Sequence, residues 1–400
     1  MTQGLSFDGL LVVSLIAVGA PLLAAAIPRV KVPAVVLEIV AGIVVGPSVL
    51  GWVKVDQAIA VLALVGLAFL LFLAGLEIDL GALRGDLLKL PLLGFAVTLG
   101  VGLVVGLGFA AAGWVKNPLF LAIALSATSL GLVVPVLKDA GFADQPLGQF
   151  TIAGATVADF GGVLLLSFLF SEAKGGPASR LVTVSLFAAV IAAVGFWLAR
   201  AGRSMGVDAY LVRLQDTTAE IRVRIAVALL VGFVALAERV GLETILGAFL
   251  AGAVLGTVDR DTTSHPQFRT KLEAVGYGFV IPVFFVTSGL RFDLDALTSS
   301  PAAAARVPLF LAALLAVRGI PALLYRRALG KDGAVTAALL QATSLPFLVT
   351  ASAIGVSIGA IRPVTAAALV SAGLLSVVLF PPLALARLRR VPASTTGGPS

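Results

Sequence analysis

The chain has 400 residues, of which 59% are hydrophobic and only 12% are charged. A soluble domain averages about 25% charged residues, so the composition excludes an ordinary soluble protein and indicates a polytopic membrane protein made of α-helices. The absence of cysteine excludes disulfides, thiol nucleophiles and cysteine-based metal sites. The net charge is +7, but no basic domain points to nucleic acid.

Apolar runs long enough to span a bilayer follow one another along almost the whole chain. By length we expect about 13 spans, at residues 9–27, 34–50, 56–76, 88–112, 118–137, 147–171, 181–199, 223–237, 242–257, 273–290, 303–325, 334–358 and 363–386. They make residues 1–386 a single transmembrane domain. A short basic tail, residues 387–400, follows the last span.

Lysine and arginine are distributed unevenly among the loops that connect these spans. The loops on one side, which include Arg29, Lys138 and the basic segment 200–224, carry most of the 28 lysines and arginines. Because positive residues accumulate on the cytoplasmic side of membranes, we expect these loops to be cytoplasmic. An odd number of spans in the cell membrane then places the N-terminus outside and the tail, residues 387–400, in the cytoplasm.

Short motifs of the first half of the chain recur in the second half in the same order. Ala-Thr-Ser-Leu at 127–130 recurs at 342–345, and other motifs recur at nearly the same offset. Corresponding motifs are seven spans apart, as the second span is from the ninth, and this odd offset inverts the second copy in the membrane. We expect inverted five-helix repeats over about 34–171 and 242–386, an arrangement that in secondary transporters places the binding site near the bilayer midplane.

Two charged side chains lie within the spans. Asp159 is at the middle of the apolar run 147–171, and Arg318 is the only charged residue of 307–325. An ionisable group at the bilayer centre costs at least about 2.5–3.5 kcal/mol, so such groups usually mark a pathway for charge. A carboxylate holds a proton or a dehydrated Na⁺ or K⁺, but not both. We therefore expect Asp159 to bind the transported cation and the proton, and Arg318 to compensate its charge.

The repeated Ala-Thr-Ser-Leu motif lies in the middle of both of its spans. Small hydroxylated residues offer the backbone alternative hydrogen bonds, and a proline removes a backbone donor. We expect two broken helices, the first interrupted at Thr128 and Ser129 and the second at Thr343, Ser344 and Pro346. Their ends would bring partial charges of about ±0.5 to the membrane centre. The alternative is two continuous helices in which the hydroxyls bond to the backbone.

Several stretches resemble signatures of the monovalent cation:proton antiporter-2 family, the Kef/NapA-type sodium or potassium/proton exchangers. These stretches are residues 37–51, 70–77, 124–129, 246–252 and 282–286. The resemblance extends over residues 10–386. It implies a sodium/proton antiporter fold with two crossing broken helices, a homodimer, and an elevator-like exchange of Na⁺ or K⁺ for H⁺.

The resemblance also implies roles for individual residues. Asp159 matches the ion-binding aspartate of the family, Thr128 and Ser129 match its first broken helix, and Arg318 matches the basic residue of its core domain. The residue before the aspartate is usually Asp, Asn or Gln, whereas this chain has Ala158. One titrating group beside an arginine that keeps its proton leads us to expect one proton per monovalent cation, and thus electroneutral exchange.

Two other functions remain open from the sequence. A sodium-coupled symporter of an organic anion would need additional polar residues in the spans, and a transport-inactive scaffold or sensor would not need Asp159. We do not expect an enzyme or a cofactor, because no nucleophile–base pair, metal cluster or phosphate loop is evident. The expected partners are Na⁺ or K⁺, H⁺, the lipid bilayer and a second copy of the chain.

Overall fold

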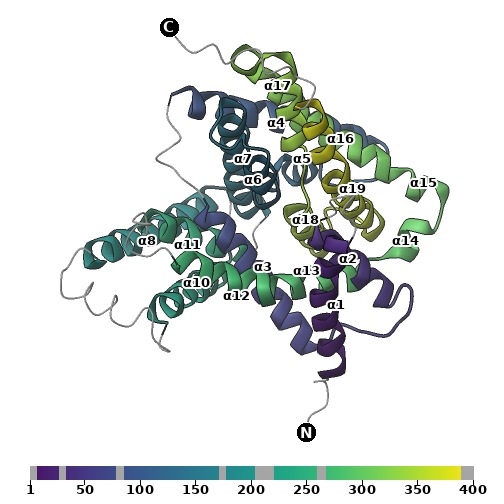
Figure 1. Ribbon diagram of the computed structural model, residues 1–400, viewed down its shortest axis with the longest axis horizontal. Coiled ribbons are helices and arrows are strands. Elements are labelled where there is room, and N and C mark those ends of the chain that lie inside the picture. Colours follow the sequence, from purple (N-terminus) through teal and green to yellow (C-terminus); the bar gives the residue numbers. More distant parts are fainter. Residues whose placement is uncertain are drawn as a thin grey trace. The chain divides into compact units, whose positions relative to one another are not determined.

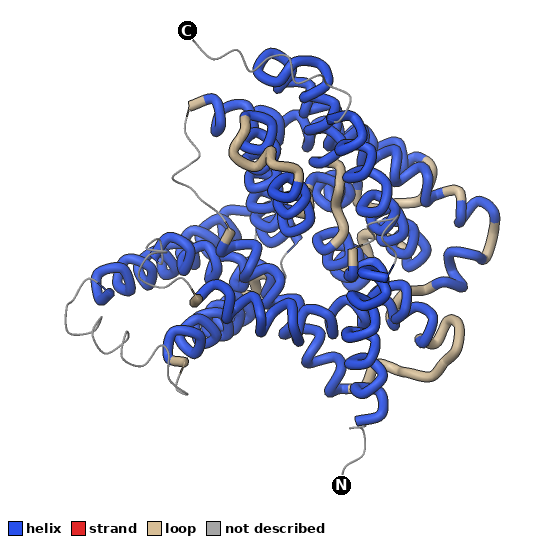
Figure 2. The backbone as a smooth tube through the Cα atoms, viewed as in Figure 1, coloured by secondary structure: helices blue, strands red, loops and turns tan. Residues whose placement is uncertain are grey.

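The computed structural model describes residues 7–26, 33–77, 85–170, 177–202, 220–258 and 267–388. Their regular secondary structure is helical, with one isolated β-bridge between Val115 and Ile361 (Figure 1, Figure 2). Eight helical segments are long and apolar enough to cross a membrane, and four more apolar helices have 10–17 residues. The all-helical class predicted from the composition is confirmed. The predicted tail lies almost wholly outside the described residues.

Each predicted span coincides with helix. The described α-helices are α1 (Phe7–Ala26), α2 (Ala34–Val45), α3 (Gln57–Leu76), α4 (Asp86–Ala111), α5 (Pro118–Ser126), α6 (Leu130–Asp139), α7 (Pro146–Phe170), α8 (Pro177–Gly202), α10 (Ile221–Arg239), α11 (Thr244–Val258), α12 (Phe268–Val275), α13 (Ile281–Leu290), α14 (Leu294–Thr298), α15 (Pro301–Ala304), α16 (Arg306–Ala322), α17 (Arg326–Gln341), α18 (Pro346–Ser357) and α19 (Pro363–Leu388). A π-helical turn, Gly276–Val280, joins α12 to α13, and a 3₁₀ turn, Leu323–Tyr325, joins α16 to α17.

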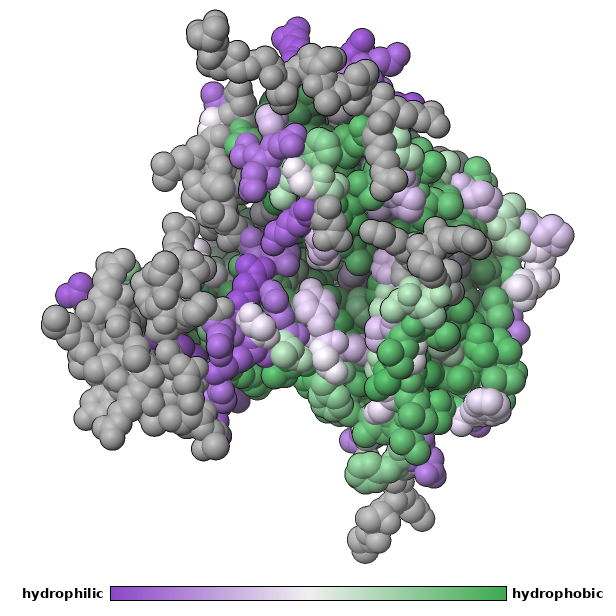
Figure 3. All heavy atoms as spheres, viewed as in Figure 1, coloured by the Kyte–Doolittle hydropathy of each residue, from purple (hydrophilic) through white to green (hydrophobic). Residues whose placement is uncertain are grey.

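The chain folds into two compact units, and each unit combines segments that are far apart in the sequence. Unit 1 comprises the described parts of 1–30, 37–81 and 163–292, and unit 2 those of 31–36, 82–162 and 293–400. In the face drawn in Figure 3, the described residues include many hydrophobic side chains and a band of hydrophilic ones. Leu11, Leu15, Val104 and Leu181 are among the large apolar residues that are more than half exposed, as lipid-facing positions require.

In unit 1 the helices approach one another through glycines. The backbone of Gly75 in α3 lies against the Phe249 carbonyl of α11, and Gly252 of α11 lies against the Phe72 carbonyl of α3. Gly42 of α2 and Gly289 of α13 form a second reciprocal contact of this kind. In lipid, where burial of apolar surface does not drive association, small residues let backbones pack closely. This packing builds the scaffold of unit 1.

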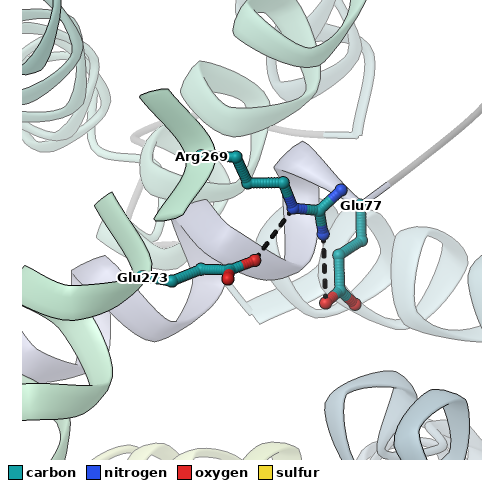
Figure 4. Close-up of polar contacts among 3 residues, drawn as sticks. All are labelled: Glu77, Arg269 and Glu273. Carbon is teal, nitrogen blue, oxygen red and sulfur yellow. Dashed lines mark hydrogen bonds and ion pairs between the residues drawn. The ribbon is translucent and has the colours of Figure 1, made fainter. Parts of the chain in front are cut away.

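An ion-pair cluster joins α3 to α12 at the polar end of unit 1. Arg269 lies 2.9 Å from a carboxylate oxygen of Glu273 on its own helix and 3.4 Å from one of Glu77, directly after α3 (Figure 4). The Arg269 side chain is 51% exposed. Exposed ion pairs contribute only about 0–1 kcal/mol each, so this cluster adds little to the stability of unit 1.

In unit 2, α5 packs along α4, and α19 contacts α16, α17 and α18. Buried side chains of α7, α16 and α17 form one apolar cluster around Tyr325 and Phe150. The helical backbone is interrupted at residues 127–129, between α5 and α6, and at 342–345, between α17 and α18. Both predicted helix breaks are therefore present, and the alternative of two continuous helices is wrong.

The reciprocal contact of α3 and α11 predicts the effect of Gly252→Ala. A methyl group at Gly252 meets the Phe72 carbonyl, which belongs to rigid backbone, so we expect a loss of about 1–3 kcal/mol of stability from overpacking. The matched control is Gly108→Ala in α4, where no atom lies within 4 Å of the added carbon. Melting temperatures in detergent should fall for the first variant only; an equal fall in both would contradict the packing argument.

Candidate functional site

The backbone angles show the first interruption, and local sequence accounts for the second. Ala127 (φ −78°, ψ 154°) and Ser129 (φ −86°, ψ 90°) are extended, so the turn of α5 cannot continue into α6. Leu345 precedes a proline, a position where helical backbone is disfavoured. Pro346 itself is the first residue of α18, where its missing N–H is not needed.

The two interrupted segments contact each other directly. The amide of Ser129 donates a hydrogen bond of 2.8 Å to the carbonyl of Thr343. The hydroxyl of Thr128 donates one of 2.7 Å to the carbonyl of Gln341, the last residue of α17. Two broken helices therefore cross at their breaks, and groups that a continuous helix would pair internally are paired between the helices.

Asp159 lies on α7 with its carboxylate directed at the first break. Oδ1 accepts a hydrogen bond of 3.0 Å from the amide of Thr128. The side chain is half-buried, whereas the preceding Ala158 is fully buried. The sequence predicted the depth of this acid along its helix, but not that it keeps partial exposure, which an ion needs in order to reach it.

Arg318 of α16 is only 2% exposed, and its guanidinium is surrounded by oxygen acceptors. Nε and Nη2 donate to the Thr128 hydroxyl at 2.9 and 2.6 Å. Nε also lies 3.4 Å from the Gln341 carbonyl, and Nη2 lies 3.3 Å from the carbonyl of Gly154 on α7. Nη1 donates to the hydroxyl of Thr98 on α4 at 3.3 Å. Hydrogen bonds to four elements thus accommodate the buried charge.

Thr128 connects the acid and the base. Its amide holds the carboxylate of Asp159, and its hydroxyl accepts from Arg318 while donating to Gln341. The charges also match the helix ends: the carboxylate lies beside the N-terminal end of α6, and the guanidinium lies at the C-terminal carbonyl of α17. These are the ends that favour negative and positive charge respectively.

The second break has its own polar partners. The amide of Ser344 donates to the hydroxyl of Ser376 on α19 at 3.1 Å. The Ser376 hydroxyl in turn lies 3.1 Å from the Ser344 carbonyl and 2.7 Å from that of Gly373. The hydroxyl of Thr343, which follows α17, donates to the carbonyl of Leu339 in that helix at 3.2 Å. The buried hydroxyl of Ser344 has no hydrogen-bond partner within the described residues.

Sequence reasoning did not anticipate Thr98, Gly154 and the side chain of Gln341. The Gln341 amide group lies 3.5 Å from the hydroxyl of Tyr325 and donates to it. Gly154 leaves room for this pair, because a Cβ there would lie 2.8 Å from the Tyr325 hydroxyl. The one sequence signal for Thr98 is that it is a hydroxylated residue in an apolar span. Nothing in the sequence identifies Arg318 as its hydrogen-bond partner.

The hydroxyl of Thr128 is expected to be necessary for the site. In Thr128→Val the buried guanidinium loses its two shortest hydrogen bonds, and the free energy of unfolding should fall by about 1–3 kcal/mol. Thr128→Ser keeps the hydroxyl and serves as the control. Melting temperatures in detergent test this; an equal loss of stability in Thr128→Ser, which keeps the hydroxyl, would contradict the role assigned to these hydrogen bonds.

Comparisons with known proteins agree with this architecture. The chain is 29% identical to the putative Na⁺/H⁺ antiporter YjbQ of Bacillus subtilis over 369 residues. The aligned region covers 88% of this chain but only 58% of YjbQ. It is 30% identical over 276 residues to a Na⁺/H⁺ antiporter of Enterococcus hirae, covering 67% of this chain and 69% of that protein. It is also 30% identical over 282 residues to the Na⁺/H⁺-K⁺ antiporter GerN of Bacillus cereus, covering 67% of both.

A solved structure shows the same fold. The sodium proton antiporter MjNhaP1 of Methanocaldococcus jannaschii matches with a TM-score of 0.69 and 18% identity, over 96% of this chain and 98% of that one. The family model described as "Sodium/hydrogen exchanger, transmembrane" matches residues 14–385. This multi-pass membrane protein, with its two crossed broken helices, belongs to the sodium/hydrogen exchanger family.

Proposed function

We propose that the protein exchanges a monovalent cation, Na⁺ or K⁺, for H⁺ by alternating access. The observation that carries the proposal is the half-buried carboxylate of Asp159 at the crossing of two broken helices. The family assignment and the names of the Enterococcus and Bacillus cereus relatives support the same reaction. The chain spans little more than half the length of YjbQ, so the proposal concerns the transport domain.

In the proposed reaction Asp159 binds the two substrates in turn. A cation that displaces the proton on one side of the membrane is itself displaced by a proton on the other side, because one carboxylate cannot hold both. Thr128 and Ser129 line the same break and are the proposed neighbours of the bound cation. Arg318 remains protonated throughout and balances the carboxylate through Thr128. An elevator-like movement would carry the site between the two sides.

The inverted repeat supports this mechanism. Copies over about 34–171 and 242–386 would each supply one broken helix to unit 2: α5 and α6 come from the first copy, and α17 and α18 from the second. In unit 1, α3 from the first copy lies with α12 and α13 from the second. Transporters built in this way bind their substrates where the copies meet.

Further features of the proposal follow from the sequence. We place the protein in the antiporter-2 subgroup of exchangers, as a homodimer in the cell membrane, with the N-terminus outside and the C-terminus in the cytoplasm. It acts without a cofactor and is a transporter, not an enzyme. The competing functions, a sodium-coupled symporter of an organic anion and a transport-inactive scaffold, are outcomes of the experiment below.

The exchange is tested in liposomes that contain a pH-sensitive dye and an imposed proton gradient. Adding Na⁺, K⁺ or Li⁺ in turn should release protons in the wild type, and Asp159→Asn should abolish this flux because the amide cannot release a proton. The control Asp295→Asn changes an exposed acid of α14 and should keep the flux. A folded wild-type protein that moves no protons with any cation would favour the symporter or the scaffold.

The stoichiometry is tested with the same vesicles. Among the site residues that the structure brings together, Asp159 is the one acid, and Arg318 keeps its proton, so one cation should exchange for one proton. A potassium gradient with valinomycin sets the membrane potential while Na⁺ drives the exchange. Once the Na⁺ and H⁺ gradients have balanced, switching the potential from zero to negative should move no further protons; proton movement at that point would show that net charge moves in each cycle.

A further inference from the structure

One end of unit 2 carries an arginine held by an aromatic ring. The guanidinium of Arg306, the first residue of α16, lies over the ring of Trp114 at 5.0 Å from the centroid. Its Nη1 donates to the hydroxyl of Thr365 at 3.2 Å, and that hydroxyl donates to the carbonyl of Trp114 at 2.8 Å. The beginning of α16, the segment after α4 and the first turn of α19 therefore meet here.

Two more positive residues belong to the same end. The β-bridge pairs Val115 with Ile361, so Lys116 and Arg362 follow directly after the two bridged residues. The charge of Arg362 lies close enough to repel that of Arg306. Arg306, Lys116 and Arg362 are at least partly exposed, and none has a carboxylate partner among the described residues. We call these three residues the basic cluster.

The hydrogen-bonding capacity of Arg306 is not satisfied within the protein. Nη1 has an acceptor in Thr365, whereas Nε is buried and has no hydrogen-bond partner in the described part of the chain. A guanidinium is suited to bind phosphate oxygens with several N–H groups at once. The buried Nε cannot itself reach a ligand, but the exposed Lys116 and Arg362 stand beside this guanidinium and give the basic cluster the charge and the accessible donors of an anion site.

Next to the basic cluster, the adjoining ends of α4 and α16 expose large apolar side chains, which we call the apolar surface. Leu107 and Val104 lie one and two turns before the end of α4 and are 55% and 70% exposed. Leu309, one turn into α16, is 46% exposed. The two helices are in contact, and Phe109 packs against Phe310 with ring centroids 4.7 Å apart. A ligand with a negative head and apolar chains matches this surface.

We propose that the basic cluster binds the phosphate of an anionic phospholipid, whose acyl chains lie along α4 and α16. Tryptophan beside the head group is typical of a membrane interface. A free phosphate ion shares the charge of the head group but would make no use of the apolar surface, so the lipid is the better match. The site lies apart from Asp159 and does not depend on the exchange reaction.

The test measures the melting temperature of the purified protein in a neutral detergent. Phosphatidylglycerol, phosphatidylcholine or inorganic phosphate is added to the wild type and to two double variants, Arg306→Gln/Arg362→Gln and Lys116→Gln/Arg362→Gln. The second variant leaves the contact between Arg306 and Trp114 in place. Arg291→Gln is the control, because Arg291 is an exposed arginine of unit 1 that ends α13.

Phosphatidylglycerol should raise the melting temperature of the wild type and of Arg291→Gln, and this rise should be strongly reduced in both double variants. Comparing the lipid-induced shifts, rather than the melting temperatures themselves, separates lipid binding from any loss of folding stability. An undiminished shift in the double variants would overturn the site. An equal shift with phosphatidylcholine or with inorganic phosphate would overturn the assignment to an anionic lipid.

Discussion

A guanidinium taken out of water loses hydration worth several kcal/mol, and only complete pairing compensates for this loss. Arg318 meets that requirement with oxygens from α4, α7, α17 and the first helix break. No single helix provides them, so the charge is stable only when these elements are assembled around it. The positions of the two broken helices in unit 2 depend on this interaction.

The helix breaks and the buried charge therefore require each other. An unbroken α17 would keep the Gln341 carbonyl in its own helix, where it could not accept from Thr128 and Arg318. Without Arg318, the carbonyl end of α17 would lie in a low-dielectric interior without a positive charge. The same reasoning applies to Asp159, whose carboxylate lies at the positive end of α6. Polar groups that would be costly one by one become a satisfied network when they are together.

Features with a local cause could be predicted from the sequence. The membrane class follows from apolar run length, the breaks from Thr, Ser and Pro at mid-span, and the two charges from their isolation among apolar residues. The contacts of the site could not be predicted in this way. Thr98 and Arg318 are 220 residues apart, and their partners include main-chain groups such as the Thr128 amide and the Gln341 carbonyl, which every residue possesses.

The division into two units was also beyond sequence reasoning, for a similar reason. The units interleave along the chain, so no linker or change of composition marks a boundary. Glycines carry a partial signal: Gly42 and Gly252 are each followed by another glycine four residues later, a spacing that lets helices pack closely, but only the structure identifies Gly289 and Phe72 as their partners. The packing partners of a glycine depend on how the helices are arranged in three dimensions, and short stretches of a single sequence do not reveal that arrangement.

The half-helices are short, and this has an electrical consequence. α5 and α6 have 9 and 10 residues, so each extends about 14–15 Å, roughly half of a hydrocarbon core of about 30 Å. An ion that reaches Asp159 from either side would therefore cross about half of the transmembrane voltage, worth about 1 kcal/mol per 100 mV. In a balanced exchange these contributions cancel over a full turnover, yet the occupancy of the site by cation or proton at each stage would still respond to voltage.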